Sequence, residues 1–527
     1  MIRLYGLLFE SKETSALEYL GKLIQNSPFA GKVFLAGGAV RDEILGKPVK
    51  DIDIVVAMPD GGIAFANWIT KKIGAYRDGS NPVIYPRFGT AKFNLRGANH
   101  NGVDLSGVDI ESVMTRGEKY ETGSRKPEVV YADLKADAER RDLTVNSLFK
   151  DLVTGEIKDL TGKGLSDIKN GVVRTPLDPD TTFTDDPLRM LRAVRFAVKY
   201  NWKMPLSLVK ALKRNADQLK NISTERIQDE FNKILMTNQP DVGLRLLSYT
   251  GLNKYIVPEL DACRGVKQNE HHDKDVFDHT LEVIKNTPPD LTARLSALFH
   301  DIGKPQTKSV GEDGRVHFYE HEDRGAEMAA QIMQRLKYSN DDIASVANIV
   351  QNHMRLKPAG SDGEKATDKT LRKFMSSLGG DLSSALMMMQ ADNVSHKGSS
   401  AMPNQIPALK QRMETLASQQ PSGARPTLPI NGHDIMKALN IKPGPIVKNI
   451  LKAIEDVWYE NPELDAETAI GIAKAAYDQA SIDNGPNGVM TQKIRNPETD
   501  NDILVKTALK YPDDHPAKIA ARKLLEK

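Results

Sequence analysis

The chain has 527 residues, of which 40% are hydrophobic and 27% charged, and its formal net charge is only +2. So balanced a charge neither requires nor excludes a nucleic-acid partner, and any such contact must come from a local basic surface. No apolar run approaches the roughly 20 residues that span a bilayer, and the single cysteine, Cys263, excludes intrachain disulfides and fits the reducing cytoplasm that we expect as its location.

A chain of this length should hold three or more domains, because single hydrophobic cores stop growing near about 250–300 residues. Residues 1–30 predict a short helical lead-in, and residues 31–160 mix strand patterns with short helices. Residues 57–107 are rich in Gly, Asn and Pro and predict a stretch that contains a mobile loop, with a strand-like piece at Thr90–Leu95. Helical periodicity dominates from about residue 184, and Gly- and Pro-rich stretches at 418–429 and 484–488 predict boundaries.

Two aspartates, Asp51 and Asp53, stand two apart in a run of β-branched residues that predicts a strand over Asp51–Val56. A strand's period of two places both carboxylates on one face, roughly 6–7 Å apart. This spacing suits two divalent cations about 3.5–4 Å apart. Upstream, Gly37-Gly38 allows backbone to approach a phosphate, and a helix is predicted to follow. The alternative is a solvent-exposed strand after an ordinary turn.

Further polar residues follow in a strand predicted over Val108–Met114. Asp109 is a candidate third carboxylate beside the first two, and Arg116 lies within reach of a phosphate. An exposed strand acid is the equally weighted alternative for Asp109.

Two later motifs carry residues suited to a nucleotide. Arg141 offers a planar donor fork for phosphate or ribose oxygens, and Asp142 and Asn146, four apart, predict one helix face that can bind a ribose hydroxyl. Asp186 and Arg189 lie three apart at a predicted helix start, where Asp186 can also act as a cap. An aspartate accepts from the amino group of cytosine or adenine while an arginine donates to the adjacent ring nitrogen. Uracil and guanine present the opposite order of hydrogen-bond donor and acceptor at these positions, and such a site would reject them.

The chain resembles the class II tRNA nucleotidyltransferase and bacterial poly(A) polymerase superfamily, densely over residues 30–260 and weakly to about 480. Four motifs in this order carry the resemblance: Gly37-Gly38-Ala39-Val40-Arg41-Asp42, Asp51-Ile52-Asp53, Arg140-Arg141-Asp142-x-x-x-Asn146 and Asp185-Asp186-x-x-Arg189. It implies an α/β nucleotidyltransferase head with a small mixed sheet, followed by all-α neck, body and tail domains. One departure is Asp185, where the family often has glutamate.

The resemblance also implies an activity and the residues that perform it. C, C and A would be added to the 3′ end of tRNA from CTP and ATP, by in-line attack of the RNA 3′-hydroxyl with two bound metals. Asp51 and Asp53 would hold Mg²⁺, with Asp109 as a further catalytic candidate. The residues implied or predicted to bind the nucleotide are Gly37, Gly38, Arg41, Arg116, Arg141, Asp142, Asn146, Asp186, Arg189, Arg192 and Arg195.

A second set of metal-ligating residues lies farther along the chain. His279, the pair His300-Asp301, and Asp392 are separated His and Asp ligands on predicted helices, which suits a catalytic divalent metal. His321 and His353 are further candidates, and His271-His272-Asp273 belongs to a run rich in ligands. The order resembles the HD phosphohydrolase superfamily over about 270–395. It implies removal of phosphate, or opening of a 2′,3′-cyclic phosphate, at damaged RNA ends by a metal of open identity. A metal that only stabilises the fold is the alternative.

The predicted organisation is a lead-in at 1–30, a head at 31–160 and a neck at 161–260. An HD body at 261–400, an RNA-binding tail at 401–484 and a C-terminal extension at 485–527 follow. A poly(A) polymerase on the same fold is the first rival. The second rival is an RNA-end phosphohydrolase with an inactive head. Intact motifs in the head argue against the second, and the HD motif favours tRNA over poly(A).

Overall fold

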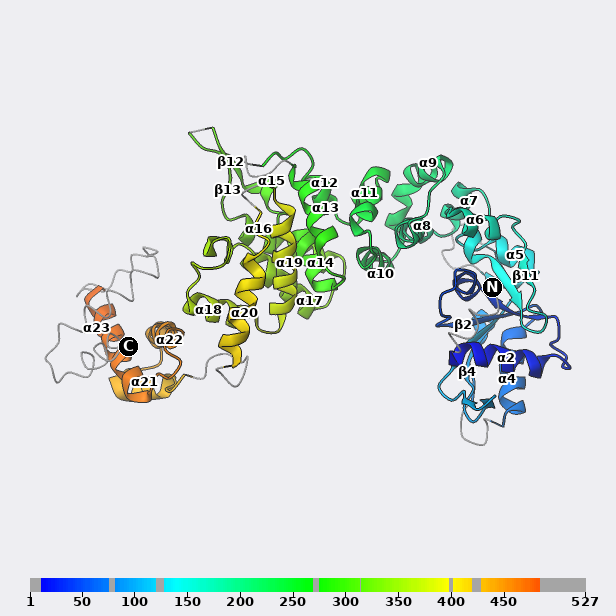
Figure 1. Cartoon of the computed structure of the whole chain (residues 1–527), viewed down its shortest axis with the longest axis horizontal. Helices are drawn as coiled ribbons and strands as arrows, with labels where there is room; N and C mark the ends of the chain where they lie inside the picture. Colours follow the sequence, from blue (N-terminus) through cyan, green and yellow to red (C-terminus); the bar gives the residue numbers. More distant parts are fainter. Residues whose placement is uncertain are drawn as a thin grey trace.

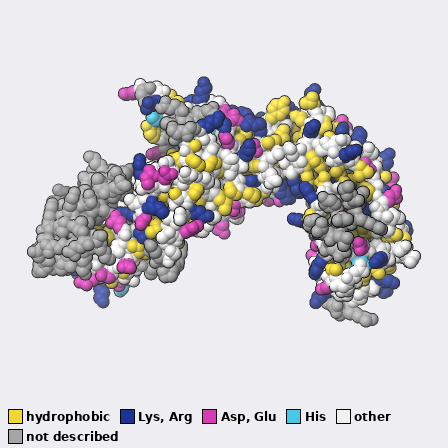
Figure 2. Space-filling model, in the orientation of Figure 1, with side chains coloured by type: hydrophobic (Ala, Val, Ile, Leu, Met, Phe, Trp, Pro, Cys, Tyr) yellow, Lys and Arg dark blue, Asp and Glu magenta, His cyan; other side chains and the backbone are white. Residues whose placement is uncertain are grey.

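The computed structural model describes residues 11–74, 81–119, 128–268, 274–312, 314–397, 401–418 and 428–483. The described parts form an arch, with the N-terminal head at one end, helical layers in the middle and the helices α21, α22 and α23 at the other end (Figure 1). None of the described helices is long and apolar enough to cross a membrane. On the face seen in Figure 2, basic and acidic side chains are interspersed.

The head contains a seven-stranded mixed sheet with the order β11-β10-β1-β2-β7-β4-β3. Only β2 and β7 pair in parallel, and the other neighbours are antiparallel. This confirms the predicted small mixed sheet. Its strands are β1 (Val33–Ala36), β2 (Ile52–Val56), β3 (Val83–Tyr85), β4 (Thr90–Asn94), β7 (Asp109–Met114), β10 (Leu148–Asp151) and β11 (Ile157–Asp159). Two small ribbons join β5 (Asn99–His100) to β6 (Val103–Asp104) and β8 (Arg116–Lys119) to β9 (Glu128–Tyr131).

One face of the head sheet is covered by helices and the other is partly open. Ile52, Ile54 and Phe93 point into a cluster that also holds residues of α2 (Lys12–Ile24) and α4 (Gly61–Lys72). Helix α2 lies within the stretch predicted as a helical lead-in, and the buried helix α4 lies within the stretch 57–107 predicted to contain a loop. The burial of the apolar residues of α4 outweighs the low helix propensity of the two glycines at its start. The remaining short elements of the head are α3 (Gly38–Ile44), α5 (Leu134–Glu139), η2 (Pro86–Phe88) and η3 (Thr144–Asn146).

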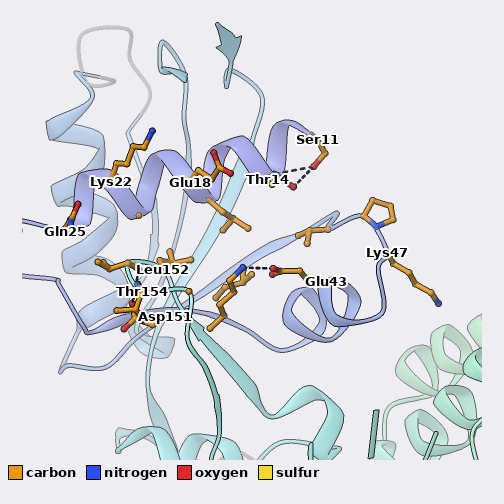
Figure 3. A pocket seen from close by; sticks show the side chains of 18 of the residues that line it. Ser11, Thr14, Glu18, Lys22, Gln25, Glu43, Lys47, Asp151, Leu152 and Thr154 are labelled. Atoms are coloured by element: carbon orange, nitrogen blue, oxygen red, sulfur yellow. Dashed lines mark hydrogen bonds and ion pairs between the residues drawn. The ribbon is translucent and has the colours of Figure 1, made fainter. Parts of the chain in front are cut away.

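A hollow of ≈ 730 Å³ lies between α2, the α3–β2 connection and the turn after β10 (Figure 3). Lys150 forms an ion pair with Glu43 there. Because its lining mixes Lys22 and Lys47 with Glu18 and Glu43, its charge favours neither anions nor cations.

Helices make up most of the remaining described chain. The neck contains α6 (Gly164–Asn170), α7 (Pro179–Asp185), α8 (Leu188–Tyr200), α9 (Leu206–Asn215), η4 (Ala216–Asn221), α10 (Thr224–Leu235), α11 (Pro240–Thr250), η5 (Leu252–Tyr255) and α12 (Pro258–Asp261). The body contains α13 (Val276–Asn286), α14 (Leu291–Phe299), α15 (Lys304–Thr307), α16 (His321–Arg335), α17 (Asn340–Asn352), η6 (Lys357–Ala359), α18 (Asp368–Leu378), η7 (Gly379–Asp381), α19 (Leu382–Ser395) and α20 (Gln405–Ser418). A two-stranded ribbon of β12 (Lys308–Val310) and β13 (Val316–Phe318) interrupts the predicted all-α body.

The tail has a hydrophobic core of its own. Residues of α21 (Gly432–Leu439), α22 (Pro445–Trp458) and α23 (Ala466–Asp483) form a cluster separate from the one that runs from the head into the body. The helix α20, predicted as the first part of the tail, instead packs Ile406, Leu409 and Met413 into the body cluster. Polar contacts join tail and body: Lys369 pairs with Glu460 and Lys373 with Asp456.

The buried thiol of Cys263 is expected to be nearly inert in the folded protein. It is 1% exposed, and burial raises its pKa to about 12. Since only the thiolate reacts, a thiol reagent at pH 8 should modify the native protein roughly a thousandfold more slowly than the denatured chain. Spectrophotometric titration with an aromatic disulfide measures both rates, and equal rates would contradict the buried position.

Candidate functional site: a nucleotide cleft in the head and a histidine–aspartate cluster in the body

Strand β2 carries Asp53 on the open face of the head sheet, and Asp51 precedes the strand directly. The parallel register places Glu111 of β7 opposite Asp53. Burial raises the pKa of Asp53, and the nearby charge of Glu111 raises it further. Crowded carboxylates of this kind are suited to a cation, because a bound positive charge relieves both effects.

The register thus places Glu111 directly beside Asp53, two residues further along β7 than the predicted Asp109. Asp109 starts the same strand but accepts a hydrogen bond from Asn94 of β4 (2.9 Å). Sequence reasoning missed Glu111 because Asp109 and Glu111, two apart, share one face of the same strand, and only the register between β2 and β7 shows which of them pairs with Asp53.

The turn between β1 and α3 requires glycine. Gly37 has a φ of +68°, and a Cβ there would lie 3.0 Å from Nη1 of Arg141. At Gly38, a Cβ would lie 3.4 Å from Arg41. The Arg41 side chain is buried, donates to Asn146 and to Asp42, and lies over the ring of Phe196. The backbone of this turn can thus approach a phosphate closely beside two guanidinium groups.

Asp142 and Asn146 are paired, although not on the predicted helix. Helix α5 ends at Glu139, and the chain turns through η3 before reaching Asn146. Asn146 still donates to Asp142 (3.0 Å), and Arg192 of α8 forms an ion pair with the same carboxylate (2.7 Å). Burial alone would raise the pKa of Asp142, but Arg192 and hydrogen bonds from Asn146 and Leu143 lower it. The carboxylate therefore stays ionised as an acceptor.

Asp186 and Arg189 lie where α7 meets α8. One oxygen of Asp186 accepts from the backbone N–H of Leu188 (3.1 Å), which is the predicted capping role, and the other pairs with Arg226 of α10 (3.0 Å). Arg189 is 8% exposed and donates to the carbonyl of Thr182 (3.4 Å). The sequence did not single out Arg226, which comes from a neck helix forty residues away.

A cleft of ≈ 560 Å³ collects most of the predicted nucleotide-binding residues between head and neck. Its lining includes Gly37, Gly38, Arg41, Asp53, Arg116, Arg141, Asp142, Asn146, Asp186, Arg189 and Arg192, together with Glu111, Arg140, Phe196 and Arg226. Asp51, Asp109 and Arg195 do not line it. Arg195 instead pairs with the buried Glu230 of α10 (2.7 Å).

The second site lies in the body, where four helices and the His300-Asp301 turn bring histidines and aspartates together. Nε2 of His279 lies 3.1 Å from Asp392 and 3.8 Å from Asp301. Nε2 of His300 lies 3.2 Å from Asp301. Nε2 of His321 lies 3.6 Å from the other oxygen of Asp301. All five side chains are at most 8% exposed.

Three histidines of this cluster are oriented alike. Nδ1 of His300, His321 and His353 each contacts the backbone carbonyl three residues earlier, at 2.8, 2.8 and 2.6 Å. Such a contact places the ring proton on Nδ1 and leaves Nε2 as an acceptor. Nε2 of His321 and of His353 is buried without a hydrogen-bond partner among the described residues. Burial lowers the pKa of His353 to about 3, so its ring stays neutral and able to bind a metal.

Three overlapping groups of this cluster have donor atoms close enough to hold an ion: His279 with Asp392 and His396, His279 with His300 and Asp301, and Asp301 with His321 and His353. Both candidate histidines, His321 and His353, thus join the predicted residues. His396 was missed, although its spacing of four from Asp392 on one helix could have indicated it. The predicted His271-His272-Asp273 lies outside the described residues.

Three family models match this chain. The poly A polymerase head domain matches residues 33–174, the probable RNA and SrmB-binding site of polymerase A matches 203–264, and the HD domain matches 276–394. An A-adding tRNA nucleotidyltransferase of Deinococcus radiodurans is 31% identical over 62% of this chain and 75% of its own length. The chain belongs to the tRNA nucleotidyltransferase and poly(A) polymerase family.

Other relatives in this family differ in length. A multifunctional CCA protein of Nitrosococcus oceani is 29% identical over 62% of this chain and 77% of its own. A mitochondrial CCA tRNA nucleotidyltransferase of Saccharomyces cerevisiae is 33% identical over 48% of this chain, which spans only 47% of the yeast protein. The Bacillus stearothermophilus CCA-adding enzyme, solved with CTP, shares the fold, with a TM-score of 0.62 and 21% identity over 90% of this chain and 99% of its own.

Proposed function

We propose that this nucleotidyltransferase adds C, C and A to the 3′ end of tRNA, with CTP and ATP as substrates. The observation that supports it most strongly is the cleft itself. The carboxylate Asp53, the glycine turn at Gly37, and the pair Asp186 and Arg189 come from separate elements and line one cleft. The similarity to a multifunctional CCA protein and to a yeast CCA tRNA nucleotidyltransferase supports the same activity.

Different residues of the cleft would bind the triphosphate, the ribose and the base of the nucleotide. The triphosphate would bind at the Gly37-Gly38 turn beside Arg41 and Arg141, whose planar forks match phosphate oxygens. Asp142, ionised and held by Asn146, would accept from a ribose hydroxyl. Asp186 would accept from the amino group of cytosine or adenine while Arg189 donates to the ring nitrogen. Both side chains have other partners, Arg226 and the Thr182 carbonyl, so reading a base requires an exchange of partners.

Asp51 and Asp53, with Glu111 beside them, would hold Mg²⁺, a hard cation that prefers oxygen ligands. The raised pKa of Asp53 fits this assignment, since an acid crowded by another carboxylate gains from a bound cation. A divalent ion would supply charge stabilisation for the phosphate groups and lower the pKa of the attacking hydroxyl.

We further propose that the histidine–aspartate cluster of the body, called the HD cluster below, hydrolyses phosphoesters at RNA 3′ ends, so that one chain can clean an end and then extend it. The buried histidines, three of them oriented alike by contacts to backbone carbonyls, and the two buried aspartates are a suitable ligand set for a divalent transition metal. Lys304 and Lys357 pair with Asp301 and Asp392, each at 2.7 Å, and bring positive charge to the rim of the cluster, where a phosphate would bind.

A primer-extension assay tests the first proposal. Purified protein receives a tRNA transcript that ends before C-C-A, Mg²⁺, and CTP alone, ATP alone or both. Two residues from CTP and then one from ATP are the expected result. A long ladder with ATP alone would make the chain a poly(A) polymerase, a single A on a C-C end would make it A-adding, and no extension would leave the HD cluster as the working site.

Asp186→Ala is expected to lower the preference for CTP over UTP by roughly a hundredfold or more, because a site that hydrogen-bonds its substrate rejects mismatched groups strongly. Competition between CTP and UTP in the same extension assay measures the ratio. Arg226→Ala is the control, since it removes the present partner of Asp186 but not the base-reading carboxylate. An unchanged ratio in Asp186→Ala would exclude the base-reading role.

A further inference from the structure

The open face of the head sheet continues beyond Asp53 toward the end strand β3. In the sheet register, Asp53 pairs with Glu111, Glu111 with Lys92, and Lys92 with Val83. Directly paired residues point to the same face of a sheet. These four side chains therefore form one row across β2, β7, β4 and β3. Nζ of Lys92 lies 3.2 Å from Glu111, so the row is also linked by an ion pair.

A neighbouring row ends in an aromatic side chain. Val113 pairs with Thr90, and Thr90 pairs with Tyr85 of β3. Tyr85 and Val83 are two apart and therefore share the open face. They are 43% and 55% exposed. Ile84, between them, points to the face that α4 covers.

The glycine turn of the nucleotide cleft lies on the other side of Asp53, and the cleft reaches only as far as Glu111 and Val113 of β7 on this side. Gly37 and Gly38 follow β1, and the sheet order places β1 on one side of β2 and places β7, β4 and β3 on the other. In Figure 1, β4 lies farther from the neck helix α8 than β2 does. In-line transfer requires the attacking hydroxyl and the leaving pyrophosphate to lie on opposite sides of the α-phosphate. A triphosphate held at the glycine turn therefore leaves β4 and β3 as the approach for the RNA end.

We propose that Lys92 and Tyr85 bind the last nucleotides of the acceptor RNA and guide its 3′-hydroxyl to Asp53. This rests on the proposed nucleotide addition. Lys92 supplies a compact positive charge for a backbone phosphate, and Tyr85 supplies a ring on which a base stacks. Stacking tolerates any base, because every base has a π-face. Such tolerance suits an end whose terminal base changes with each addition.

Kinetics on a minihelix with the acceptor stem test the proposal. Tyr85→Ala is expected to raise the KM for the RNA about tenfold, and the KM for ATP should stay within about twofold of the wild type. Lys92→Ala should raise the KM for the RNA about fivefold and reduce the salt dependence of RNA binding by about one phosphate contact. The matched controls are Ile84→Ala, on the same strand but the other face, and Lys71→Ala, at the exposed end of α4.

A second measurement does not depend on activity. A minihelix with 2-aminopurine as its terminal base loses fluorescence when that base stacks on an aromatic ring. The wild type and Ile84→Ala should quench it on binding, and Tyr85→Ala should lose most of the quenching. Equal quenching in Tyr85→Ala and Ile84→Ala, or an equal rise in the KM values for RNA and ATP, would overturn the proposal. If the wild type adds no nucleotide to any RNA, the proposed function fails, whereas the fluorescence titration still decides whether Tyr85 binds an RNA end.

Discussion

Replacing Asp53 with asparagine is expected to reduce nucleotide addition by about a thousandfold or more while leaving the fold intact. A lost metal ligand removes several kcal/mol of transition-state stabilisation, and each 1.36 kcal/mol is about tenfold in rate. Burial, and then the charge of Glu111, raise the pKa of Asp53 in the folded state. At any pH above the ordinary pKa of an aspartate, the ionised side chain therefore destabilises the fold. Removing that charge should therefore not lower the melting temperature at neutral pH. Primer extension and thermal denaturation measure the two effects.

Two further substitutions test whether Glu111 or Asp109 is the third carboxylate beside Asp51 and Asp53. Glu111→Gln should reduce addition strongly, because Glu111 lies opposite Asp53 in the register. Asp109→Asn should have a small effect, since Asp109 is engaged by Asn94 at 2.9 Å and does not line the cleft. Near-normal addition by Asp53→Asn would contradict the metal assignment. A larger loss of addition in Asp109→Asn than in Glu111→Gln would show that Asp109, and not Glu111, is the third catalytic carboxylate.

Replacing His321 with asparagine is expected to lower phosphoester hydrolysis by about a hundredfold or more and to reduce the bound metal. Its Nε2 is buried without a hydrogen-bond partner among the described residues and lies 3.6 Å from Asp301. The asparagine side chain is shorter than that of histidine and cannot place a metal-ligating atom at the position of Nε2. Hydrolysis of a 2′,3′-cyclic nucleotide and metal content by mass spectrometry measure the two losses.

His317→Asn is the matched control for this prediction. It lies four residues earlier in β13, is half-buried and belongs to none of the three ligand groups. Nucleotide addition should be unchanged in both variants, because the neck helices separate the body from the head (Figure 1). Full hydrolysis and full metal content in His321→Asn would show that His321 is not a ligand. Metal bound without any hydrolysis by the wild type would favour a role in stability alone.

The sequence by itself was sufficient for the family and the mixed sheet, and it singled out most of the residues that the fold brings together in the head cleft and in the histidine–aspartate cluster. Local patterns determine these features: the alternation around Asp53 predicts its strand, and the order of motifs predicts the later helices. The one clear error within a motif concerns Asp142 and Asn146. Their spacing of four favours a helix, but their hydrogen bond forms instead across a tight turn closed by Arg41 and Arg192.

The tertiary structure alone decided the contacts between segments far apart in the chain. The choice of Glu111 over Asp109 depends on the register of two parallel strands, which a period of two cannot specify. Arg226 reaches Asp186 because α10 packs against the start of α8, and His396 joins the cluster through the packing of α19 on α13. The row from Asp53 to Val83 exists only because β4 and β3 extend the sheet on the side opposite the glycine turn. Side-chain spacing fixes which residues share a face, whereas packing fixes which faces meet.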